Sequence, residues 1–123
     1  MSDRSLVLAG GLCGVVGVAL SAVAAHAGGG NIDTAASFLL MHAPAFLAIG
    51  LLGAGHVLRI GGFVLLLGLL LFAGDLVMRH YLGARAFPMA APIGGGAMIL
   101  GWLIVALSAF ASWSALPGPD RTP

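Results

Sequence analysis

The sequence predicts an all-α integral membrane protein whose four helices form an antiparallel, up-down-up-down bundle. Of its 123 residues, 60% are hydrophobic and only 7% are charged, whereas a soluble domain carries about 25% charged residues. The few charges also divide the chain into long uncharged stretches. Each stretch can supply the roughly 20 residues with which an α-helix crosses the hydrocarbon of a bilayer.

These stretches place the helices at about residues 6–27, 34–54, 60–82 and 92–114. The third helix reaches spanning length only if it continues through Asp75. Strands are disfavoured because the stretches are long, rich in leucine and alanine, and lack alternation of polar and apolar residues. The linkers are short, and short linkers make neighbouring helices antiparallel. We therefore expect a single transmembrane domain over residues 1–123, surrounded by a lipid bilayer.

The first apolar stretch allows a second interpretation. Arg4, the apolar run and the sequence Ala25-His26-Ala27 resemble a secretory signal peptide with its cleavage site. The run exceeds the usual length of a signal core, about 7–15 residues, so we interpret it as a spanning helix. The single cysteine, Cys13, excludes an intramolecular disulfide and is interpreted as a packing residue.

Small residues recur along one face of the first predicted helix, at spacings of four, three, four and four: Gly10, Gly14, Gly17, Ser21 and Ala25. Lipid provides little hydrophobic drive for helix association, so close packing over small residues helps to hold transmembrane helices together. The face therefore predicts helix packing, either inside the bundle or against a second copy or a partner subunit.

Asp75 is a carboxylate inside the third predicted span, after the uncharged run Ile60–Gly74. A charge at membrane depth is costly, so it usually faces protein or water and has a partner. Arg79 follows at the i,i+4 spacing of a helical ion pair. We expect Asp75 to face the bundle interior or a protein partner, paired with Arg79. The pair can also be purely structural, neutralising itself so that the helix inserts.

The hairpin order gathers polar residues in one half of the membrane. We call the end of the bundle that holds residue 1 side A and the opposite end side B. His26 closes the first helix at side B, and His42 lies about 12 Å into the second helix. Asp75 lies roughly 10 Å from the side-B end of the third helix. Together with Arg79, these residues form a candidate polar intramembrane site.

His42 and Trp102 also have structural interpretations. Pro44 leaves the carbonyl of Leu40 without its helical donor, which offers His42 a hydrogen-bond partner. Trp102 lies in the middle of the fourth span and is interpreted as a packing residue.

Four short motifs follow one another along the chain. They are Ala25-His26, Met41-His42-Ala43, Phe72–Leu76, and Ala91–Gly95 with Gly101-Trp102. In this order they resemble the G-A-H-G, Y-H-A, F-S-G-S/D-L and P-I-G-G…G-W motifs of the domain-of-unknown-function 423 family. Members of that family are small four-helix membrane proteins of bacteria and mitochondria. The glycines around His26 are mostly alanine or serine here. The resemblance implies the fold and adds weight to His26, His42 and Asp75, but it implies no activity.

Three classes of function remain open. The first is an accessory or structural subunit, or scaffold, of an inner-membrane complex, bacterial or mitochondrial, with partner subunits or further copies as its partners. The second is proton-coupled or small-solute permeation using Asp75 and His42. The third is a cofactor site ligated by His26 and His42.

The sequence favours the first class. It contains no C-x-x-C-H, H-E-x-x-H or nucleophile motif, so we expect no enzyme activity, no cofactor and no metal site. The basic residues are all arginines and stand singly, so we expect no nucleic-acid partner.

Overall fold

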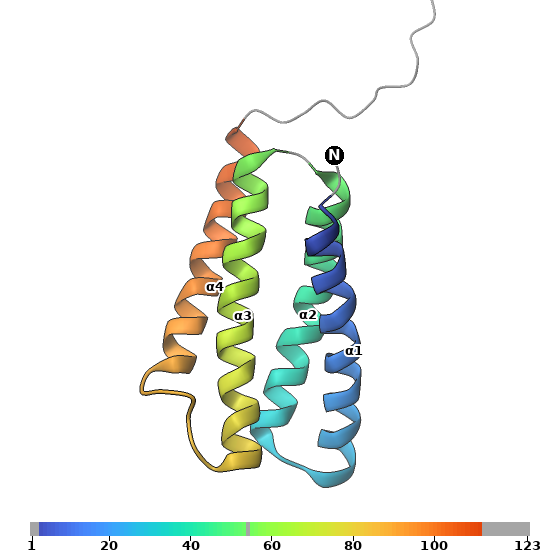
Figure 1. The fold of residues 1–123 in the computed structure, drawn as a ribbon, viewed down its shortest axis with the longest axis vertical. Coiled ribbons are helices and arrows are strands. Elements are labelled where there is room, and N and C mark those ends of the chain that lie inside the picture. Colours follow the sequence, from blue (N-terminus) through green and yellow to red (C-terminus); the bar gives the residue numbers. More distant parts are fainter. Residues whose placement is uncertain (1–2, 54, 112–123) are drawn as a thin grey trace, which may run out of the picture.

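The computed structural model describes residues 3–53 and 55–111, which are almost entirely helical. The helices are α1 (Arg4–Ala27), α2 (Gly30–Leu52), α3 (His56–Leu82) and α4 (Ala90–Leu107), followed by the 3₁₀ turn η1 (Ser108–Phe110). Each of the four α-helices is long and apolar enough to cross a membrane. They run alternately up and down (Figure 1), which confirms the predicted fold class.

All four helices begin earlier than the sequence predicts, and two of them by about a full turn. α2 starts at Gly30 and α3 at His56, four residues before the expected positions. The expected limits excluded Asp33 and Arg59 because both are charged, but the first turn of a helix at the membrane surface accommodates a charge. Asp33 lies in the first turn of α2, where a carboxylate interacts favourably with the partly positive helix N-terminus. Residue 54 and residues 112–114, the ends predicted for two helices, lie outside the described residues.

The helices form two tight hairpins. α1 packs along α2 and α3 packs along α4, while the hairpins meet mainly between α2 and α3. In Figure 1 the helices stand in a row, with α1 and α4 at its two edges. The described chain begins and ends at side A, as an even number of spans requires (Figure 1).

Glycine allows the close approach of helices within each hairpin. A Cβ atom at Gly10 of α1 would lie 2.9 Å from the carbonyl oxygen of Ala43 on α2. A Cβ atom at Gly94 of α4 would lie 2.6 Å from the backbone nitrogen of Phe72 on α3. These separations leave no room for a side chain, so backbone packs directly on backbone, as in other transmembrane helix pairs.

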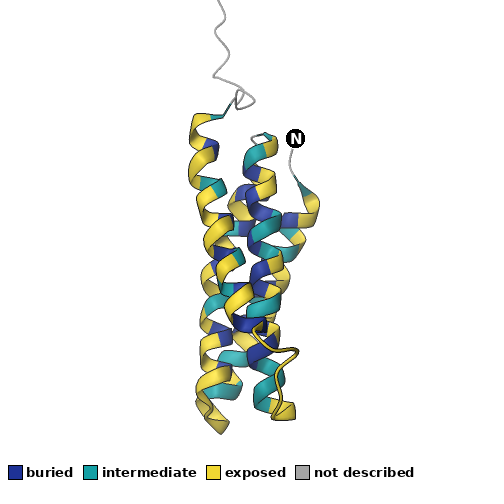
Figure 2. Cartoon of the chain, turned by 90° about the vertical axis from the view of Figure 1, so that its left-hand side faces the viewer, coloured by how far each residue is buried: buried dark blue, intermediate teal, exposed yellow. Residues whose placement is uncertain are grey.

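Side chains between the helices are buried and those on the outside are apolar. Phe46 of α2 and Leu65 of α3 are fully buried, whereas Leu67 of α3 and Leu107 of α4 are more than half exposed. Figure 2 shows the buried residues on the inner sides of the helices and the exposed residues around them. In a membrane this outer surface faces lipid, so the burial pattern matches the spans inferred from composition.

Candidate functional site

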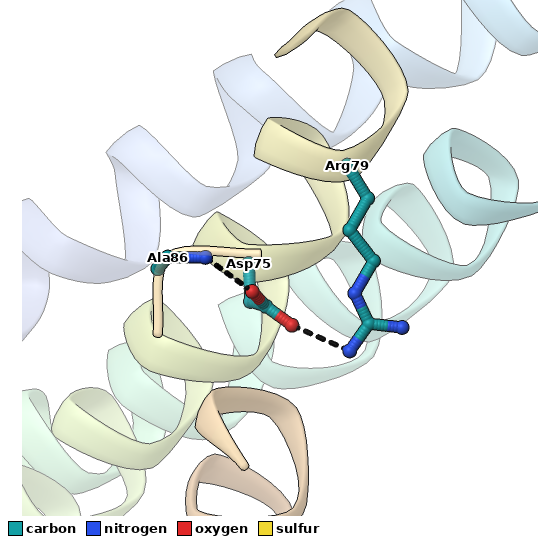
Figure 3. A network of polar contacts seen from close by, with 3 residues as sticks. All are labelled: Asp75, Arg79 and Ala86. Atoms are coloured by element: carbon teal, nitrogen blue, oxygen red, sulfur yellow. Dashed lines mark hydrogen bonds and ion pairs between the residues drawn. The ribbon is translucent and has the colours of Figure 1, made fainter. Parts of the chain in front are cut away.

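Asp75 lies on the inward side of α3 and is only 1% exposed. Nη2 of Arg79 donates to its Oδ2 at 2.7 Å, and the backbone N–H of Ala86 donates to its Oδ1 at 2.8 Å (Figure 3). Ala86 belongs to the connection between α3 and α4, residues 83–89. One carboxylate oxygen is therefore held by the helix that carries Asp75, and the other by the connection that follows it.

This arrangement makes Asp75 an anchor for the α3–α4 connection. α3 ends at Gly83, whose φ of 67° lies in the left-handed region that glycine adopts without strain. The chain then reverses direction, which brings the N–H of Ala86 back to the carboxylate. Hydrogen bonds to an ionised group are stronger than neutral ones, and a buried charge requires such partners.

His42 is a second buried polar group, 2% exposed on α2. Its Nδ1 lies 2.8 Å from the carbonyl oxygen of Phe38, and its Nε2 lies 3.2 Å from Nε1 of Trp102 on α4. An indole N–H only donates and a carbonyl only accepts, so Nδ1 carries the proton and Nε2 is the acceptor. The neutral imidazole thus forms a hydrogen bond between α2 and α4, which belong to different hairpins.

The partners of His42 differ from those that the sequence suggests. The acceptor is the carbonyl of Phe38 rather than that of Leu40, because a helical side chain points back over the turn that precedes it. Trp102 is a hydrogen-bond donor to His42 and not only a packing residue. The sequence carries a signal for this role, since an indole N–H within a span needs an acceptor.

The structure does not bring His42 and Asp75 together. Phe38 and Phe72 lie between them, with ring centroids 4.7 Å apart. His42 is one turn from Phe38 toward side A, and Asp75 is one turn from Phe72 toward side B. The two groups are therefore separated by roughly 10 Å along the helix axes. Because α2 starts at Gly30, His42 is about 18 Å from the start of its helix, deeper than the sequence suggests.

The other polar residues at side B lie near the surface. His26 is exposed in the last turn of α1 and contributes to neither hydrogen-bonded group. The ring of His80 packs against Gly29, where a Cβ atom would lie 2.6 Å from Cε1 of the imidazole. The φ of Gly29 is 115°, a conformation that favours glycine. His80 therefore fixes the end of α3 against the turn between α1 and α2, a contact that sequence reasoning missed.

The residues of the predicted small-residue face of α1 lie in different surroundings in the structure. Gly10 and Gly17 pack closely on α2, whereas a Cβ atom at Gly14 would meet nothing within 4 Å. Ser21 is half-buried and Ala25 is exposed. Of the five positions, two make close contact inside the chain, and packing of Gly14 against a partner stays a prediction. The buried residues of α1 are Leu6, Gly10, Cys13 and Gly17.

A second ion pair, which sequence reasoning missed, lies at side A. Asp3 caps α1, since its Oδ1 accepts a hydrogen bond from the N–H of Ser5 at 3.0 Å. Its Oδ2 lies 2.7 Å from Nε of Arg59 on α3. Oδ2 accepts no well-aligned hydrogen bond from the described residues, so this contact is chiefly electrostatic. The N–H of Asp3 donates to the carbonyl of Gly50 at 2.7 Å, so one residue links α1, α2 and α3.

The histidines considered as cofactor ligands lie in different surroundings. His26 is at the end of α1, whereas both ring nitrogens of His42 are engaged by Phe38 and Trp102. Within residues 3–53 and 55–111, no three histidine, cysteine, aspartate or glutamate side chains are grouped so as to hold a metal ion. The geometry of the buried polar groups is therefore that of helix-linking hydrogen bonds.

The chain is similar to known membrane proteins. The model of the family described as "Protein of unknown function (DUF423)" matches residues 20–95. A UPF0382 membrane protein of Haemophilus influenzae is 32% identical over 124 aligned residues, which cover 93% of this chain and 99% of that protein. A UPF0382 membrane protein of Staphylococcus haemolyticus is 26% identical over 117 aligned residues, which cover 87% of this chain and 96% of that protein. No solved structure shows significant similarity. With four membrane-spanning helices and a family match over more than half of its length, this integral membrane protein belongs to the DUF423 family.

Proposed function

We propose that this chain is a non-catalytic accessory or structural subunit of a complex in the inner membrane, bacterial or mitochondrial. One observation carries the proposal: the polar groups buried in the spans bond to the chain itself. Asp75 engages both carboxylate oxygens with Arg79 and Ala86, and His42 engages both ring nitrogens. A group that transfers protons or binds a substrate must exchange its partners, whereas these groups hold helices and a connection in place.

The outer side of α1 supports a protein partner. α1 lies at one edge of the row, and 22% of its most apolar stretch is buried, the same share as in the fourth span at the other edge and half that of α2 and α3. Gly11 and Gly14 both leave open space where a Cβ atom would stand. Small residues in lipid gain most when a second helix approaches closely. We therefore assign this side of α1 to a partner subunit or a second copy of the chain.

The other two function classes receive less support. Permeation through Asp75 and His42 would require a path past the packed rings of Phe38 and Phe72, and Asp75 would have to release Arg79 and Ala86. A histidine-ligated cofactor would require His42 to release Trp102. Each rearrangement removes partners from a buried polar group, which costs free energy.

The test is extraction from native membranes in a mild detergent, followed by sizing and identification of companion subunits. Wild type is compared with Gly14→Leu and with the matched control Gly74→Leu, which also fills open space but on α3. We expect wild type and the control to extract as an assembly. Gly14→Leu should extract as a free chain, and thermal unfolding should show that this free chain is still folded.

Three results would contradict the proposal. The first is a wild-type chain that extracts alone, and the second is an assembly that Gly14→Leu leaves intact. The third is a pH-dependent proton flux in liposomes that Asp75→Asn abolishes while the protein stays folded. That third result would establish permeation in place of a structural role.

A further inference from the structure

The end of the bundle around Asp75 carries two arginines, Arg79 and Arg85, and two aspartates, Asp75 and Asp33. Both arginines come close to the Asp75 carboxylate: Arg79 bonds to it directly, and Arg85 immediately precedes Ala86, whose backbone N–H also bonds to it. Arg79 makes the direct ion pair at 2.7 Å, while Arg85 is exposed in the α3–α4 connection. A single carboxylate neutralises one of these two cations. Asp33, which is also at side B, is exposed in the first turn of α2 and offsets the partial charge of that helix end.

Arg79 also keeps hydrogen-bond donors that Asp75 does not use. A guanidinium presents five N–H groups, and one of its terminal nitrogens faces the carboxylate (Figure 3). The rest of the guanidinium points away from Asp75, and the side chain is 25% exposed. Its Nε is buried and has no acceptor among the described residues, so the donors that can reach the surface are those of the terminal nitrogens. Arg79 therefore remains able to donate to a second anion while the pair with Asp75 stays in place.

The two arginines lie at the level of the lipid headgroups. α3 has 27 residues, a length of about 40 Å at 1.5 Å per residue. The hydrocarbon core of a bilayer is only about 30 Å thick, so the ends of α3 extend into the polar layers. Arg79 is in the last turn of α3 and Arg85 follows that helix by three residues. Phosphate groups are the anions present at this level, and arginine matches their geometry with two parallel donors.

We propose that Arg79 and Arg85 bind a phosphate group at the side-B surface, with Asp75 holding Arg79 and the adjoining connection in position. The location assigns this phosphate to the headgroup of an anionic phospholipid. A free phosphate-bearing solute shares the same chemistry and is distinguished by the experiment. This site does not depend on the accessory role proposed above. That role rests on the outer side of α1, whereas the phosphate site lies at the side-B end of α3.

The experiment measures lipid binding to the purified chain in detergent by native mass spectrometry, with thermal unfolding as a second readout. Phosphatidylglycerol is compared with phosphatidylcholine of identical acyl chains, and inorganic phosphate is added separately. Arg85→Gln tests the site because it leaves the Asp75–Arg79 pair intact. Arg4→Gln is the matched control, since Arg4 is an exposed arginine at side A.

We expect phosphatidylglycerol to bind wild type and Arg4→Gln equally, and to bind Arg85→Gln about fivefold more weakly, the factor that one arginine contributes near an anionic surface. Phosphatidylcholine should bind all three chains alike. Phosphatidylglycerol should also raise the melting temperature of wild type. If inorganic phosphate leaves the melting temperature unchanged, the ligand is the lipid headgroup. If inorganic phosphate raises it as much as the lipid does, the ligand is a free phosphate compound instead.

Two outcomes would overturn the proposal. Phosphatidylglycerol binding no more tightly than phosphatidylcholine to wild type would show that the site does not recognise phosphate charge. Equal losses for Arg85→Gln and Arg4→Gln would show that any attraction is spread over the whole protein. Melting of each variant without lipid verifies that the comparison is made between folded chains.

Discussion

The two ion pairs in the described part of the chain have the same separation but different surroundings. Asp3 and Arg59 at side A approach to 2.7 Å, with side chains 13% and 58% exposed. Asp75 and Arg79 at side B also approach to 2.7 Å, with side chains 0% and 25% exposed. The first pair joins the start of α1 to α3 in the other hairpin. The second lies within α3 and, through Ala86, closes the α3–α4 hairpin.

The difference indicates that burial, and not distance, determines how much each pair contributes to the stability of the fold. Solvent and salt screen an exposed pair, so its net contribution to stability is small. Removing one partner of a buried pair leaves the other charge without compensation where little water reaches it, and this is strongly destabilising. The side-B pair should therefore be essential to the fold, while the side-A pair should be dispensable.

The largest effect is expected for Asp75→Asn. The amide can still accept from Ala86, but Arg79 loses its counter-charge. We expect the melting temperature in detergent to fall by roughly 10 °C or more. Adding Arg79→Ala to Asp75→Asn should then cost less than Arg79→Ala costs in wild type, because the pair is coupled. Strictly additive losses would contradict a coupled pair.

A smaller loss of stability is expected when a side chain is added at the glycine contact between α3 and α4. Gly94→Ala places a Cβ atom 2.6 Å from the backbone nitrogen of Phe72, which cannot move without shifting α3. We expect a loss of about 1–3 kcal/mol, as for other overpacked sites. Gly95→Ala is the matched control, since a Cβ atom there meets nothing within 4 Å. Equal melting of the two variants would show that the helices are not in contact at Gly94.

Trp102→Phe tests the hydrogen bond from Trp102 to His42, which joins the two hairpins without a charged group. It removes the donor to Nε2 of His42 and leaves that buried acceptor unpaired. The expected loss is about 1 kcal/mol, measured by chemical unfolding in detergent. Adding His42→Phe removes the unpaired acceptor, so the double variant should lose less than the sum of the two single losses. Independent losses would argue against a bond between these side chains.

The smallest effect is expected for Arg59→Gln at side A. Because the Arg59 side chain is 58% exposed, its pair with Asp3 should contribute about 1 kcal/mol or less, and roughly 1 M salt should remove most of that difference. Asp3→Asn removes the other charge of the pair and should give a similarly small loss, because asparagine caps a helix about as well as aspartate. A loss as large as that of Asp75→Asn would refute the contrast between the two ends.

The sequence by itself determined the class of this protein and one of its polar contacts. Long uncharged stretches establish the spans, because hydrocarbon excludes charge and requires every backbone group to bond within a helix. The i,i+4 spacing of Asp75 and Arg79 places them on one face of any helix that contains both. These features depend on composition and helical periodicity, which are local properties of the chain.

Only the tertiary structure decided which residues meet across helices. Ala86 reaches Asp75 from a connection eleven residues on, and Trp102 reaches His42 from sixty residues away. The helix starts at Gly30 and His56, and the open space beside Gly14, were likewise not determined by spacing. In lipid all four helices are apolar on every side, so hydrophobic patterning cannot specify how each one rotates. Close backbone packing at the glycines and the partners of a few buried polar groups specify it instead.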